Sequence, residues 1–251
     1  QVAKSNVAIG NTKYTFKVYS NYIEKYYTHK TKKWFTAKST WFGSLEKPIF
    51  IVNYEFKNSG TIVKDLKFSV TGTIDIGIHS HRMAKNDLAE NFQDNGFTVI
   101  RFWDGANNSY QGLAGFDTAP DTWSIYPVGT TPVDNINTVT ASTEVAFTLG
   151  KIITLNPGEI KKVSFICCAD TNGWTPALAD YYRDGINHRQ VEFDKVKKFY
   201  DNKFYSSSSI HLQTPDAVLN SAFEFLKAVE FKNNRLLPFG LPDYNNLPVL
   251  V

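Results

Sequence analysis

Apolar and polar residues alternate along most of residues 1–170, which is typical of strands with one buried face. In residues 49–57, for example, Val52, Tyr54 and Phe56 fall on one face of an extended chain. Similar runs predict strands at 12–20, 33–42, 66–78, 97–103, 144–149, 151–155 and 160–168, with Gly72 marking a bulge or bend in the longest of them. Turn-forming segments rich in Asn, Pro and Gly separate these runs. The pattern predicts a mainly β fold, a large antiparallel two-sheet super-sandwich followed by C-terminal helices.

The apolar period changes to that of helices after residue 170. Thr175 and Pro176 begin one predicted helix, and a second helical run covers 191–200. For a third helix, Thr214 fits the N-cap and Pro215 the first helical position, because proline lacks the N–H that has no partner there. The pattern divides the chain into a sandwich domain (1–170), a helical linker (171–210), and the first helix and proline-rich tail of a helical domain (211–251).

The last segment leaves many apolar residues without a predicted cover. Between Leu236 and Val251 the chain is apolar and interrupted by prolines, so it does not continue the helix. We therefore expect the rest of the natural chain, or a partner subunit, to pack against this tail.

Charge, hydropathy and cysteine content limit the binding partners and the cellular locations that can be expected. Lys and Arg exceed Asp and Glu by 27 − 24 = +3, which is too small an excess to indicate nucleic acid binding. No apolar run has the roughly 18 residues that span a bilayer. The sequence begins at Gln1 rather than Met, which fits a processed extracellular or periplasmic protein; a cytoplasmic location is the alternative. Cys167 and Cys168 are adjacent and are expected to be two buried free thiols.

The sequence offers few groups for catalysis. Asp104, Asp117 and Asp121 lie in a loop-rich segment, but turn-capping is the simpler role for them, so no catalytic residue is assigned. His79 and His81 would share one face of a strand, yet no third ligand is nearby, and we predict no metal site. The sequence also lacks the glycine-rich motifs that bind nucleotides and dinucleotides, so no cofactor is expected.

Sugar recognition is the better supported activity. Aromatic rings can stack on the apolar faces of sugars while neighbouring polar groups bind the hydroxyls. Rings and one carboxylate suited to this lie in or near predicted loops: Trp103, Asp104, Tyr110, Trp123, Tyr126 and Trp174. The alternative is that the rings fill the sandwich core. Trp34 and Trp41 lie inside strand-like runs and are expected in the core.

The segment TPDAVLNSAFEFLKAVEF, followed by LLPFGLPDYNNLP, resembles the entry into the helical barrel of six-hairpin glycoside hydrolases of the glycogen-debranching and glucoamylase-like type. In that family a β super-sandwich and a linker helix precede an (α/α)6 barrel, which carries the acid and base of an inverting hydrolysis. The resemblance implies that this chain is the noncatalytic N-terminal sandwich portion of such a protein, acting on oligo- or polysaccharide. The alternatives are a carbohydrate-binding or cell-surface sandwich module, and a structural protein that assembles through its apolar tail.

Overall fold

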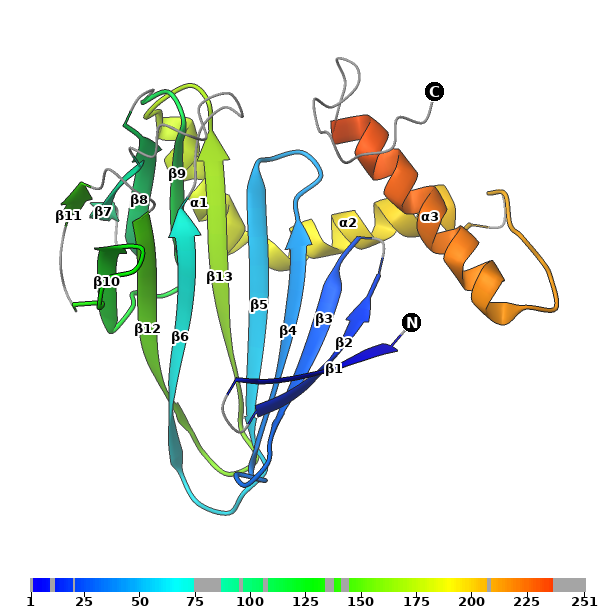
Figure 1. The fold of residues 1–251 in the computed structure, drawn as a ribbon, viewed down its shortest axis with the longest axis horizontal. Coiled ribbons are helices and arrows are strands. Elements are labelled where there is room, and N and C mark those ends of the chain that lie inside the picture. The colour runs from blue at the N-terminus through cyan, green and yellow to red at the C-terminus, as the bar shows by residue number, and fades with distance from the viewer. Residues whose placement is uncertain are drawn as a thin grey trace.

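A computed structural model describes residues 2–9, 12–19, 21–74, 87–94, 97–105, 108–133, 138–140, 145–206 and 209–236. The described segments form a mainly β fold, as the alternation predicts (Figure 1). The strands are β1 (Val2–Ile9), β2 (Thr12–Val18), β3 (Ile23–His29), β4 (Phe35–Gly43), β5 (Ile49–Asn58), β6 (Lys64–Ile74), β7 (Asp87–Asp94), β8 (Phe97–Asp104), β9 (Gln111–Phe116), β10 (Thr122–Pro127), β11 (Thr138–Thr140), β12 (Val145–Leu155) and β13 (Ile160–Asp170). The helices are α1 (Pro176–Asn187), α2 (Arg189–Phe204) and α3 (Ala217–Leu236).

The described strands build two antiparallel sheets of very different width. The large sheet has ten strands in the order β1-β2-β3-β4-β5-β13-β9-β8-β7-β11, and the small sheet has three in the order β10-β12-β6. The prediction of a large two-sheet antiparallel sandwich is therefore confirmed. Because the small sheet is so narrow, it covers only part of the large one.

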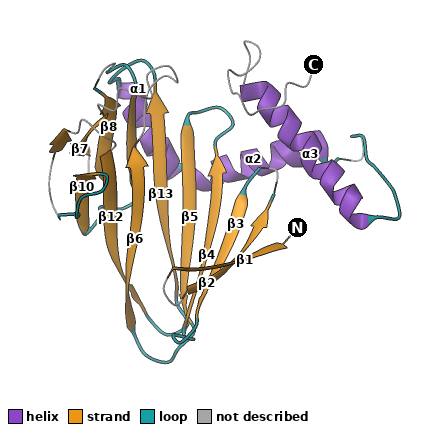
Figure 2. Cartoon of the chain, in the orientation of Figure 1, coloured by secondary structure: helices purple, strands orange, loops and turns teal. Residues whose placement is uncertain are grey.

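The large sheet separates two hydrophobic cores. Its inner face packs against the small sheet through residues such as Val52, Phe116 and Phe165. Its outer face packs against α1 and α2, which lie behind the strands in Figure 2, through residues such as Ile51 and Ile166. Where a strand is covered on both faces, consecutive side chains are buried, as Ile51 and Val52 of β5 are.

The adjacent cysteines of β13 illustrate the two cores. Cys168 belongs to the core beneath the helices, whereas Cys167 packs against the core between the sheets. Successive side chains of a strand point to opposite faces, so the two thiols are not bonded and both are free, as predicted. Burial raises the pKa of Cys167 to about 11 and also raises that of Cys168.

Helix α1 approaches the large sheet closely because glycine lies at both contact points. In α1, a Cβ on Gly185 would lie 2.8 Å from a methyl carbon of Ile166. On β9, a Cβ on Gly115 would lie 2.3 Å from the hydroxyl oxygen of Tyr182. That hydroxyl donates a hydrogen bond of 2.7 Å to the Phe116 carbonyl, and the Tyr182 side chain is fully buried. Gly185 lies within α1 and does not interrupt the helix.

Helix α2 is fixed to the β4–β5 turn by a buried carboxylate. Glu192 is 2% exposed, and its carboxylate accepts hydrogen bonds from Ser44 Oγ at 2.7 Å and Lys195 Nζ at 3.1 Å. Burial by itself would raise the pKa of this carboxyl, but the two hydrogen bonds and the lysine charge lower it below its ordinary value.

Several sequence predictions need correction. The predicted strands 144–149 and 151–155 are one strand over their described residues, β12 (Val145–Leu155), which pairs with β6 in unbroken register. Gly72 therefore marks no bulge; it leaves room for the ring of Phe147 on the neighbouring strand. Helix α3 begins at Ala217, and Asp216 rather than Thr214 caps it, because the Asp216 carboxylate accepts the N–H groups of Val218 and Leu219.

The third helix extends away from the sandwich (Figure 1). Part of its apolar side is uncovered, since Val218, Leu219 and Leu226 are 70%, 49% and 53% exposed. The apolar tail beyond Leu236, and the His79 and His81 pair, lie outside the described residues. The division of the chain into three domains stays a prediction.

Candidate functional site

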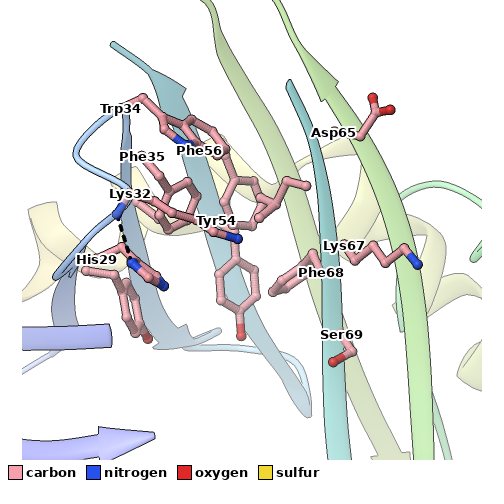
Figure 3. Close-up of a pocket in the computed structure, with 13 residues that line it drawn as sticks. His29, Lys32, Trp34, Phe35, Tyr54, Phe56, Asp65, Lys67, Phe68 and Ser69 are labelled. Carbon is pink, nitrogen blue, oxygen red and sulfur yellow. Dashed lines mark hydrogen bonds between the residues drawn. The ribbon is translucent and has the colours of Figure 1, made fainter. Parts of the chain in front are cut away.

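The narrow small sheet leaves an open groove on the inner face of the large sheet. The groove has a volume of about 660 Å³ and lies between β3, β4 and β5 on one side and β6 on the other (Figure 3). That volume is within the range of small-ligand sites, about 300–1,000 Å³. Its lining consists of Tyr27, His29, Lys32, Trp34, Phe35, Ala37, Tyr54, Phe56, Asp65, Leu66, Lys67, Phe68 and Ser69.

Aromatic rings form a continuous strip along the floor and one wall of this groove. Tyr54 and Phe56 alternate on β5 and are stacked with an interplanar angle of 3°. Phe68 reaches toward them from β6, with ring centroids 4.7 Å from Tyr54 and 4.9 Å from Phe56. Phe35 and Trp34 extend the strip toward the β3–β4 turn, through contacts of 6.5 Å (Phe35 to Phe56) and 5.7 Å (Trp34 to Phe35). Phe56 is buried, but the other four rings are only partly covered.

The groove also offers a polar group, the Tyr54 hydroxyl, that has no role in the described structure. No hydrogen-bond partner of the Tyr54 hydroxyl is found among the described residues, and this hydroxyl lies between the two sheets (Figure 3). Burial raises its pKa well above the ordinary value, so it stays protonated and able to donate a hydrogen bond at neutral pH.

His29 is held in a fixed orientation at the end of the groove that lies near the β3–β4 turn. Its Nδ1 accepts the backbone N–H of Thr31 at 3.2 Å and that of Lys32 at 3.0 Å. Since Nδ1 accepts, the neutral ring carries its proton on Nε2, which remains a donor. The neighbouring Lys32 adds a positive charge to this end of the groove.

Strand β6 contributes backbone groups as well as rings. It is the edge of the small sheet in the part of the chain that the structure describes, so alternate N–H and C=O groups face the groove instead of another strand. The side chains of Asp65 and Lys67 point away from the rings (Figure 3), and Asp65 accepts a hydrogen bond from Thr154 at 2.7 Å. The groove therefore combines ring faces with hydrogen-bonding groups at its margin, and it has one carboxylate, Asp65, among its lining residues.

Two of the six residues predicted to bind sugar come together elsewhere, on the outer face of the large sheet. The guanidinium carbon of Arg101 lies 5.2 Å from the ring centroid of Trp103 and 4.3 Å from that of Trp174. The same guanidinium donates to Glu90 at 3.1 Å and to Gln111 at 3.0 Å and 3.2 Å. The guanidinium of this cluster has its hydrogen-bond partners within the protein, which makes the cluster a less suitable sugar site than the groove.

The other four residues are distributed over the sandwich. Asp104 is buried at the end of β8, next to the half-buried Tyr110, whose carbonyl accepts the Asp104 N–H at 3.1 Å. Trp123 packs against the core between the sheets, and its indole N–H is buried without a partner among the described residues. Tyr126 lies on β10, with its hydroxyl 3.2 Å from that of Thr148. A role in sugar binding stays a prediction for all six.

The candidate catalytic carboxylates have structural partners. Asp117 accepts the backbone N–H of Ser164 at 3.0 Å, and Asp121 accepts that of Ile152 at 2.6 Å. The Ile152 hydrogen bond, followed by the Lys151 ammonium, lowers the pKa of Asp121 even though burial opposes the shift. Within the described ranges, no group of three or more His, Cys, Asp or Glu side chains is arranged to hold a metal ion. No described helix is both long and apolar enough to cross a membrane.

Sequence reasoning missed the groove. Trp34 was expected in the core because it lies in a strand-like run, and it does contact the inner core from a partly exposed position. The available signal was the high content of aromatic residues, which make up 15% of the whole chain. The aromatic content alone does not predict which of these rings the small sheet covers.

Comparisons with known proteins find likeness only among solved structures. No family model matches the sequence, and no curated protein matches it. The chain is similar to a bacterial glucoamylase in complex with acarbose (TM-score 0.48, 7% identity, 89% of this chain and 29% of that one). It is also similar to a putative kojibiose phosphorylase from the human microbiome (TM-score 0.43, 13% identity, 93% of this chain and 27% of that one). A third similar structure is a putative aldose 1-epimerase from Escherichia coli (TM-score 0.45, 7% identity, 63% of this chain and 68% of that one).

Glucoamylase is one of the protein types that the sequence resemblance named. This chain spans less than a third of the length of the first two proteins. At identities of 7–13%, these likenesses assign no activity to it.

Proposed function

We propose that this chain is a noncatalytic carbohydrate-binding β-sandwich that holds an oligosaccharide in the aromatic groove between β3–β5 and β6. The observation that carries the proposal is the continuous strip of partly exposed rings, which includes Trp34, Tyr54 and Phe68. Sugar rings have apolar C–H faces that pack on aromatic rings, and their hydroxyl groups need donors and acceptors at the edges. The Tyr54 hydroxyl, the His29 ring and the edge of β6 supply these.

A noncatalytic role is supported by the chemistry of the groove lining. Hydrolysis of a glycosidic bond by the common mechanisms needs two carboxyl groups on either side of the bond. The described lining has the single carboxylate Asp65, which is bonded to Thr154 on the outer side of β6. The groove is thus suited to holding a sugar chain and not to cutting it.

We further propose that the sandwich supports a helical catalytic domain, as the sequence resemblance implies. Two features support this role. The helices α1 and α2 are packed firmly on the outer face of the large sheet, and α3 leaves exposed apolar residues, including Leu219 and Leu226, on which further helices can pack.

The binding proposal is tested by screening the chain on a glycan array and measuring the affinity of the bound glycans by calorimetry. We expect Trp34→Ala to weaken binding by roughly two- to tenfold, the scale of one aromatic contact. Trp41→Ala is the matched control, since Trp41 lies on β4, the strand that follows Trp34 in the chain, but outside the groove lining. Tyr54→Phe removes only a hydroxyl, preserves the packing, and should also weaken binding.

Circular dichroism spectra and melting curves of the variants establish that they are folded. The proposal is wrong if no glycan binds, or if Trp34→Ala and Tyr54→Phe bind as tightly as the unmodified chain. Loss of binding in Trp123→Ala alone would instead favour the loop-region residues predicted from the sequence.

A further inference from the structure

A second, basic pocket lies next to the aromatic groove. It has a volume of about 500 Å³ and is formed by the end of the β2–β3–β4 meander. Its lining contains three lysines and no carboxylate: Lys13, Thr28, His29, Lys30, Lys33, Phe35 and Thr36. His29 and Phe35 line both this pocket and the groove, so the two are contiguous.

Local folding brings these lysines together. Lys30 and Lys33 lie in the turn between β3 and β4, which is closed by backbone hydrogen bonds from Lys33 to Thr31 and from Phe35 to Lys32. Lys13 comes from β2, where it is paired with Thr28 of β3. The short meander therefore places positive charges from two separate segments around one opening.

The described part of the chain does not neutralise the charge of the basic pocket. No ion pair is formed by Lys13, Lys30 or Lys33 with any residue that the structure describes, and the same holds for Lys32 at the groove. Elsewhere lysines do have partners, for example Lys38 with Glu24 at 2.6 Å.

The excess of positive charge continues along the rim of the groove. Lys64 lies over the Trp34 ring at 5.9 Å. In contrast, the net charge of the whole chain is only +3. A local excess of positive charge beside a ligand groove attracts anions and can bind them with charge-assisted hydrogen bonds.

We infer that the groove and the basic pocket together bind an acidic oligosaccharide, one that carries carboxylate or sulfate groups. This inference rests on the proposed function. The sugar rings lie on the aromatic strip, and an anionic substituent at one end lies among Lys13, Lys30 and Lys33. A neutral sugar would leave the lysines without a partner, whereas a simple anion would leave the rings unused.

The test compares each acidic ligand with a neutral ligand of the same sugar. One pair is oligogalacturonate and its carboxyl-reduced form, and the other is a sulfated and an unsulfated cello-oligosaccharide. Affinities are measured by calorimetry at low and physiological salt. We expect the acidic member of at least one pair to bind about tenfold or more tightly, the effect of one charge-assisted hydrogen bond, and this preference to shrink as salt is raised.

Matched variants separate the pocket from the overall charge. Lys30→Gln/Lys33→Gln removes two charges at the pocket, and Lys197→Gln/Lys198→Gln removes two exposed charges on α2. The first variant should lose the preference for the acidic ligand and keep its affinity for the neutral one. The second should behave like the unmodified chain.

The outcomes distinguish this inference from the function on which it rests. Equal binding of the acidic and neutral members overturns the charge inference and leaves the sugar-binding proposal in place. An equal loss in both lysine variants also overturns it, because the attraction would then be nonspecific. If neither member of either pair binds, and no array glycan does, the proposed function itself fails.

Discussion

Removing the hydroxyl of Tyr182 should destabilise the protein, although the substitution Tyr182→Phe keeps the buried ring. The hydroxyl donates a 2.7 Å hydrogen bond to the Phe116 carbonyl at a site with no exposed surface. Water cannot replace the lost donor there unless the helix moves away from the sheet. A buried carbonyl left without its partner costs about 1–3 kcal/mol.

The assay is urea unfolding followed by circular dichroism and tryptophan fluorescence. We expect the unfolding free energy of Tyr182→Phe to fall by about 1–3 kcal/mol with an unchanged dependence on urea. Leu178→Ala, on the same buried face of α1, should cost about 2–5 kcal/mol, because it leaves a cavity. Tyr181→Phe is the matched control, since Tyr181 is only half-buried.

The reasoning is refuted if Tyr182→Phe and Tyr181→Phe unfold at the same urea concentration as the unmodified protein. That result would mean that α1 does not dock on β9 through this hydrogen bond. The account of the second core, on the outer face of the large sheet, would then fail with it.

Three further predictions test other parts of the fold. Cys167 and Cys168 should resist Ellman's reagent at pH 8 in the folded protein and react once urea is added, because burial raises both pKa values; rapid reaction of either thiol before unfolding would contradict this. Glu192 has a lowered pKa, so its contribution to stability is present above the ordinary value of 4.5 and is lost as pH falls through the folded value. Glu192→Gln should therefore destabilise the protein more at pH 7 than at pH 3, and an equal effect at both pH values would argue against the buried hydrogen bonds. Replacing Leu219 and Leu226 by Gln should change the unfolding free energy by less than about 0.5 kcal/mol each and reduce self-association on size-exclusion chromatography; a larger loss of stability would show that α3 is covered.

Local sequence patterns were sufficient to predict an element where its buried residues recur at the period of one secondary structure. The strand β5 and the helix α1 each repeat apolar residues at the spacing of their own secondary structure, so both were predicted close to their observed positions. The strand β3 was missed because its sequence, Ile-Glu-Lys-Tyr-Tyr-Thr-His, is polar on both faces. It lies where the small sheet no longer covers the large one, and an uncovered strand needs no apolar face.

The groove could not be predicted because its position depends on which strand ends the small sheet. Trp34, Tyr54 and Phe68 lie on separate elements, and nothing in their local sequence shows which of them β6 leaves open. Lys30 and Lys33 are close in the sequence, but only the β2–β3–β4 meander brings Lys13 beside them. Likewise, Trp103 and Trp174 were visible as candidate rings, but not their contact with Arg101.

The most direct test of the central claim is an NMR titration that follows the indole N–H signals of the five tryptophans. The signals are assigned with single Trp→Phe variants, and the titrant is the tightest glycan from the array. The account predicts that the Trp34 signal shifts with the ligand while those of Trp103 and Trp174 stay in place. A titration that moves Trp103 and Trp174 and leaves Trp34 unchanged would contradict it.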